Sequence, residues 1–262
     1  MNVLCEYVHL ISIELRKTAR LYVRYPLEAA LGVAFLVVIF CGAAYGLRLA
    51  PGGQGTSNTL TIGLPADGFL VGYLCWATIL SGTSQLAQEI EDDAKSGVLE
   101  PLFLSAFPIV RIMLARSMCS VIAGLPVFIV LATIIVLISG QTHVLQPRVL
   151  PLVVALDVGA TGLGLAIAAL ALTFKRVRLV LVVVQLLVVW SLVYAPSTTL
   201  PFFFVLPILP IVWGIRESIG GFIPISVFMA LVANSAIYMI VGVLIFSKTV
   251  RFVKASGRLA HY

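Results

Sequence analysis

Five of the eleven acidic residues in this chain lie within one short polar segment. They are Glu89, Glu91, Asp92, Asp93 and Glu100. Carboxylates gathered in this way serve acid–base chemistry, metal binding or a charged contact with another protein. The sequence does not favour a metal, because the four cysteines stand singly and no Cys/His spacing of a metal site occurs. We interpret the acidic segment as a docking helix that contacts another protein; the alternative is a solvated loop helix whose charge only keeps it out of the membrane.

No catalytic set can be assembled elsewhere in the sequence. His9, His143 and His261 lie far apart, and the chain contains no GxxxxGK[ST] motif for nucleotide phosphates. The sequence predicts that this chain is not an enzyme and holds no cofactor or metal ion. Any ATP and magnesium that the protein depends on would then be bound by a separate chain.

Asp157 is the single acidic residue inside a long apolar run, in the sequence ALDVGATGLG. A carboxylate within the bilayer is unfavourable and commonly marks a functional site or a paired buried group. One interpretation is substrate or proton handling. The other is a neutral or hydrogen-bonded side chain, capped by Thr161, in a helix contact that the small residues nearby favour.

The elements that position these residues are apolar helices. Hydrophobic residues make up 61% of the 262-residue chain and charged residues 11%, which is typical of an integral membrane protein. A bilayer crossing needs about 20 apolar helical residues, and six stretches qualify. These predicted spans are Ala29–Leu47, Phe69–Ala87, Ser117–Ile138, Val149–Phe174, Leu179–Ala195 and Phe222–Ser247. The sequence predicts one all-α transmembrane domain over residues 1–262.

The distribution of positive charge orients the six predicted spans. With both termini cytoplasmic, every Lys and Arg except Arg48, Arg148 and Arg216 lies on the inner side, as the positive-inside rule requires. The stretch Leu200–Ile215 is apolar enough to be a seventh span, but three prolines interrupt it. We expect residues 196–221 to form a re-entrant segment on the outer side. Basic residues scattered between apolar runs also argue against nucleic-acid binding.

Two predicted cytoplasmic segments precede the first and the third span. Residues 1–26 contain apolar positions spaced by three or four and predict an interfacial helix on the inner leaflet. Residues 85–108 follow the second span. Within them, Gln85–Ser96 predicts a short helix that stops at Gly97, and 98–106 predicts a second helix or turn. The apolar set Val98, Leu99, Leu102 and Phe103 is expected to be exposed and suited to an interface.

The run EDDAKSGVLEPLFLSAFPIVRIMLAR resembles the stretch after the second span of ABC-2-type transporter permeases. The matching positions are Glu91, Gly97, Leu99, Glu100, Leu102, Leu104, Pro108 and Leu114. The family usually has Thr at the position of Val98 and Pro near Ala106, and often a basic residue near Asp92. In the outer segment, Pro207, Pro210 and Ile215-Arg216-Glu217 are similar to the proline-rich run before the last span. The acidic run and Gly124-Leu125-Pro126 are also similar to the haem-exporter B subunits.

This resemblance implies a permease subunit that pairs with itself or with a close relative. It also implies a separate ATPase subunit, with Glu89, Glu91, Asp92, Asp93, Gly97, Leu99, Glu100 and Leu102 in the coupling helix that docks on it. Gly42 and Gly46 form a GxxxG pattern that offers a face for the second permease subunit. The expected location is a prokaryotic plasma membrane, with the chain in contact with membrane lipids.

Several alternatives stay open at the level of sequence. The outer residues Pro207, Pro210, Trp213, Arg216 and Glu217 belong either to an aromatic belt or to an outer gate. The chain could work without an ATPase, as a secondary carrier or channel centred on Asp157. An intramembrane enzyme would need several acidic or histidine residues at one depth, and Asp157 stands alone. The cargo of an exporter is expected to be amphipathic or lipid-like.

Overall fold

The computed structural model describes residues 3–49, 59–60, 64–105, 107–140, 146–174, 178–193 and 208–255. Helices make up nearly all of this part of the chain. They are α1 (Val3–Arg24), α2 (Pro26–Leu49), α3 (Ala66–Lys95), α4 (Leu99–Leu104), α5 (Ile109–Ser139), α6 (Leu150–Phe174), α7 (Arg178–Val193), α8 (Leu209–Gly220) and α9 (Ile225–Ala255). Two-residue strands β1 (Thr59–Leu60) and β2 (Leu64–Pro65) pair antiparallel just before α3.

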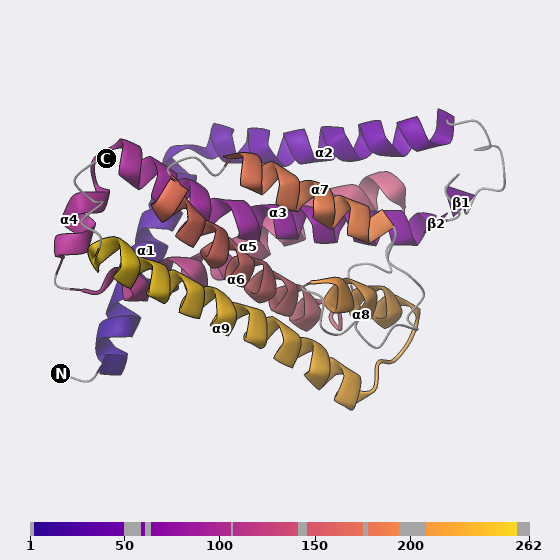
Figure 1. Cartoon of the computed structure of the whole chain (residues 1–262). Coiled ribbons are helices and arrows are strands. Elements are labelled where there is room, and N and C mark those ends of the chain that lie inside the picture. The colour runs from indigo at the N-terminus through magenta and orange to yellow at the C-terminus, as the bar shows by residue number, and fades with distance from the viewer. Residues whose placement is uncertain are drawn as a thin grey trace.

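The long helices run side by side as an elongated bundle with two distinct ends (Figure 1). One end gathers α1, α4, the last turns of α3 and α9, and the first turns of α5. The other end carries α8, the strand pair and the first turns of α9. We call the first of these the α4 end and the second the α8 end. The acidic segment lies at the α4 end. Helix α8, which belongs to the proline-containing outer segment, therefore lies at the opposite end of the bundle.

Helix α6 forms the centre of the bundle because small residues let its neighbours approach closely. Of the apolar window within α6, 78% of residues are buried, against 6% in α2. A Cβ atom at Gly242 of α9 would overlap the carbonyl oxygen of Gly162 in α6. A Cβ at Gly164 would lie 2.5 Å from the carbonyl oxygen of Gly82 in α3. The expectation that the small residues around Asp157 favour close helix packing is confirmed.

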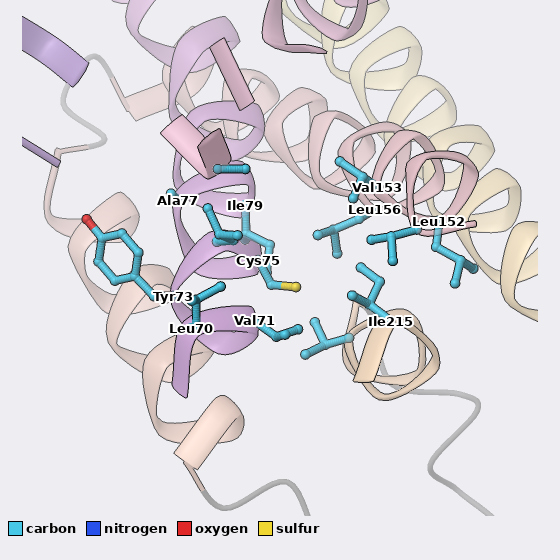
Figure 2. Close-up of a cluster of buried hydrophobic side chains, with 14 of the residues drawn as sticks. Leu70, Val71, Tyr73, Cys75, Ala77, Ile79, Leu152, Val153, Leu156 and Ile215 are labelled. Atoms are coloured by element: carbon cyan, nitrogen blue, oxygen red, sulfur yellow. The ribbon is translucent and has the colours of Figure 1, made fainter. Parts of the chain in front are cut away.

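The buried side chains form two apolar clusters along the bundle. The cluster nearer the α8 end joins α3, α6 and α8, where Cys75 and Val71 face Leu156 and Ile215 (Figure 2). Tyr73 also belongs to this cluster: its ring packs on Phe40 of α2, and its hydroxyl donates to the carbonyl of Leu36 in α2. The second cluster lies at the α4 end and is built from Leu86, Ile90, Leu99, Ile109, Met113, Leu165, Phe246 and Val250, among others.

Four helices of the described chain are long and apolar enough to cross a membrane: α5, α6, α9 and the part of α2 up to Gly46. This confirms the membrane character of the protein. The predicted spans 69–87 and 179–195 correspond to α3 and α7. Helix α3 ends in a polar third, and the apolar part of α7 is a shorter stretch, Leu179–Val189.

The predicted helix over Gln85–Ser96 is present as far as Lys95, but it is the end of a long helix and not a short one. These residues continue α3 without a break to Lys95, because neither glycine nor proline occurs between Ala87 and Ser96 and most of these residues are good helix formers. Gly97 does end the helix, with a φ of +72° that favours glycine. The predicted amphipathic helix at the N-terminus is confirmed as α1, and Pro26 opens α2 directly after it.

Candidate functional site

The acidic segment is organised around one arginine of α5. The side chain of Arg116 is 8% exposed and its guanidinium reaches three carboxylates. Its Nη1 lies 2.6 Å from Asp93 Oδ2 and 3.7 Å from Glu89 Oε2, and its Nε lies 3.5 Å from Glu14 Oε1. One basic side chain therefore ties α1, α3 and α5 together at the α4 end.

Polar neighbours extend this cluster along α3 and α5. The hydroxyl of Ser120 donates to Gln85 Oε1 at 2.7 Å, and Gln85 Nε2 donates to Glu89 Oε1 at 3.2 Å. Burial raises the pKa of Glu89, while the nearby Arg116 charge and the Gln85 hydrogen bond lower it. Burial has the larger effect, so the protein environment disfavours the charged form of this glutamate.

Glu91 and Asp92 of α3 lie near Lys95, and of these two acidic side chains only Asp92 is largely exposed. Lys95 Nζ lies 2.7 Å from Glu91 Oε1 and 3.8 Å from Asp92 Oδ1. The side chain of Asp92 is 77% exposed. The predicted carboxylates therefore divide: Glu89 and Asp93 pair with Arg116 within the bundle, whereas Asp92 is exposed to solvent beside Lys95. Glu100 lies in the first turn of α4.

The apolar residues of α4 are mostly covered by the chain itself. Leu99 is 2% exposed, and Leu102 and Phe103 pack against the cluster at the α4 end. The Nζ of Lys254 lies 5.6 Å from the centre of the Phe103 ring. The expectation that Val98, Leu99, Leu102 and Phe103 form an exposed set is wrong for all but Val98, because α4 folds back onto α3 and α9. Leu104, at 84%, is instead the most exposed apolar side chain of this segment.

Sequence reasoning did not assign Arg116 a role at this site. One local pattern does indicate that two carboxylates could share a partner: Glu89 and Asp93 are four residues apart and so lie on the same face of α3. The partner lies 23 residues beyond Asp93, and no local spacing connects the two. Glu14, the third carboxylate, comes from still farther away in α1.

Asp157 lies in the middle of α6 and is 5% exposed. Its carboxylate fits between two glycines of different helices. A Cβ at Gly82 of α3 would lie 3.1 Å from Oδ1, and a Cβ at Gly124 of α5 would lie 3.0 Å from Oδ2. Among the residues that the structure describes, none donates a hydrogen bond to this carboxylate. Thr161 does not cap it, because its hydroxyl donates to the Val158 carbonyl at 2.9 Å.

The described part of the outer segment is α8. Pro210 is buried, Trp213 is half-buried and Glu217 is exposed. Arg216 points toward α3, where its Nη2 would lie 3.4 Å from a Cβ at Gly72. Its Nε is buried without a hydrogen bond, and no ion pair joins Arg216 to Glu217 within the described residues. Pro207 lies outside the described residues.

A cavity of about 520 Å³ lies beside the Arg116 cluster. It is bounded by α1, by the first turns of α2, and by α3 and α5. Apolar atoms make up most of its wall, and Glu14, Glu28, Glu89, Lys17 and Arg116 supply its charges. In the described part of the chain, no group of His, Cys, Asp or Glu side chains is arranged to hold a metal ion.

Comparisons with known proteins identify no family: neither a family model, nor a curated protein, nor a solved structure matches this chain.

Proposed function

We propose that this chain is the transmembrane subunit of an ATP-driven exporter of the ABC-2 permease type, acting as a dimer with a separate ATPase. The observation that carries the proposal is the Arg116 cluster. It joins the last turns of α3, which directly precede the exposed turn, to α1 and α5. A push on that turn from a partner would therefore move two further helices. ATP binding and hydrolysis belong, on this proposal, to the partner chain.

The arrangement of the bundle supports six crossings with both termini on the cytoplasmic side. The first turns of α5 and the last turns of α9 lie at the same end (Figure 1), where Lys254 sits over Phe103. If α2, α5, α6 and α9 alone crossed the bilayer, α5 would begin on the side opposite to the end of α9. On this proposal, helices α3 and α7 return the chain across the membrane, so that these two ends lie on the same side.

The surface left for the ATPase is small and specific. It comprises Asp92, Val98 and Leu104, which are exposed around the turn at Gly97. Glu91, Gly97 and Glu100 lie in the same turn and its flanks. In this proposal Glu89, Asp93, Leu99 and Leu102 position the docking turn and do not contact the partner.

The test is copurification from mild detergent with a one-domain ATPase encoded beside the gene. We expect a stoichiometric partner that is lost on Glu100→Arg or Asp92→Arg, because either change reverses charge on the docking turn. Glu217→Arg, an equal reversal at the α8 end, serves as the matched control and should keep the partner. Wild-type protein that purifies alone, or docking-turn variants that bind as well as the control, would overturn the assignment.

A secondary carrier is the second candidate, and the geometry of Asp157 favours it. A buried carboxylate with no described hydrogen-bond donor is well suited to exchange a proton or a cation. On this alternative, transport follows an ion gradient, continues without any ATPase and stops with Asp157→Asn. The cargo of either system is proposed to be amphipathic, in keeping with the interfacial position of α1.

A further inference from the structure

The cavity beside α1 has the size and the wall of a ligand site. Pockets for small molecules are commonly about 300–1,000 Å³ and mostly apolar, with a few polar groups that fix the ligand. This cavity, at about 520 Å³, falls within that range and contains five charged side chains. Leu21, Tyr22 and Tyr25 contribute apolar surface at the junction of α1 and α2.

The charges around the cavity are unbalanced toward negative. Three carboxylates, from Glu14, Glu28 and Glu89, line the cavity with two basic side chains, Lys17 and Arg116. Both bases are already engaged, since Lys17 lies 3.4 Å from Glu14 and Arg116 contacts the other members of the cluster. No basic side chain of the described chain lies within ion-pair distance of Glu28. Among the lining side chains an anionic ligand would find no unpaired cation, whereas a cationic ligand would find the carboxylate of Glu28 without a basic partner.

The position of the cavity beside α1 and the start of α2 restricts the ligand further. Helix α1 is amphipathic and lies along the membrane surface on our proposal. Leu21 is half exposed, and α2 continues from it as an apolar span with its side chains outside the bundle. A ligand with a polar head in the cavity could therefore extend a hydrocarbon chain past Leu21 and Ala29 into the bilayer.

We propose that this cavity binds the ammonium head of an amphipathic amine between Glu28 and Glu89. The phenol rings of Tyr22 and Tyr25 border the head, and aromatic faces attract cations. Tyr25 already has the guanidinium carbon of Arg24 5.6 Å from its ring centre. The site does not depend on the proposed ATPase partner, because every group that forms it comes from this chain.

The experiment is photolabelling of the purified full-length protein with a diazirine derivative of dodecylamine, followed by mass spectrometry of the labelled peptides. We expect saturable labelling of the peptides containing Leu21 and Ala29. Unlabelled dodecylamine should compete with the probe, whereas dodecanol and dodecanoic acid should not. Dodecanol tests the need for charge, and the acid tests its sign.

Variants of the two glutamates then test whether the ammonium head lies between Glu28 and Glu89. The double change Glu28→Gln and Glu89→Gln should reduce competition by dodecylamine about tenfold or more, as expected when two charged contacts are lost. Asp92→Asn is the matched control, a carboxylate-to-amide change on α3 that faces solvent outside the cavity. The proposal is overturned if dodecanol competes as well as dodecylamine on wild-type protein, or if label falls evenly over the membrane-facing helices. It also fails if a folded double variant binds like the control.

Discussion

At the scale of single residues, Arg116 has the largest predicted effect on stability. Replacing it by Gln leaves Glu89 and Asp93 without their cation and leaves Glu14 with Lys17 alone. Removing one partner from a buried ion pair costs about 3–5 kcal/mol. We expect Arg116→Gln to lower the free energy of unfolding by about 3 kcal/mol, the lower end of this range, because its partners keep some contact with water. Thermal unfolding in detergent measures the loss, and Arg148→Gln, at an exposed position, is the control that should change little.

Glu89 gives the same cluster a dependence on pH. Burial raises its pKa above the ordinary value of 4.5, so the folded protein holds this proton more tightly than the unfolded chain does. The stabilising contribution is fully present below the unfolded pKa and is lost as pH rises through the folded pKa. We predict that Glu89→Gln gains stability relative to wild type as pH increases from 4.5 toward neutrality. Melting temperatures of both proteins across that range, with Asp92→Asn as control, would show whether the difference grows; a constant difference would contradict the prediction.

At the scale of elements, the contact between α6 and α9 depends on the absence of side chains. A Cβ at Gly242 would overlap the backbone of Gly162, and backbone atoms cannot move aside as a flexible side chain can. We expect Gly242→Ala to destabilise the protein by about 1–3 kcal/mol or more through overpacking. Gly32→Ala in α2 is the matched control, because nothing lies within 4 Å of a Cβ there. The control should be neutral or slightly stabilising, and equal melting temperatures for the two variants would contradict the packing described here.

The elements also show how far sequence reasoning reaches in this protein. Each predicted span corresponds to a helix, because a long apolar run in a membrane protein leaves the backbone no other stable choice. The turn at Gly97 followed from local chemistry as well. The continuation of α3 past Ala87 as one helix did not follow from the sequence pattern. The residues become polar where the chain leaves the membrane, but their helix propensity stays high. The burial of Leu99 and the role of Arg116 depend on contacts between distant segments, and these leave no local pattern.

At the scale of the whole molecule, the proposed crossing pattern makes an unambiguous prediction about sides. With six crossings, Asp92 lies in the cytoplasm and Arg148 outside. With crossings by α2, α5, α6 and α9 alone, the two positions exchange sides. Both residues are exposed in the structure, so single cysteines placed there would react readily with a maleimide reagent.

The measurement uses Asp92→Cys and Arg148→Cys in a chain whose native cysteines are replaced by serine. Intact cells are treated with a maleimide that does not cross the membrane. We expect Arg148→Cys to react in intact cells and Asp92→Cys to react only after the membrane is opened. The reverse pattern would place the docking turn outside the cell, where an ATPase could not reach it. Both the exporter proposal and the six-crossing topology would then be wrong. The expected pattern would leave the acidic turn, α1 and the end of α9 on one cytoplasmic face, where a single ATPase could contact all three.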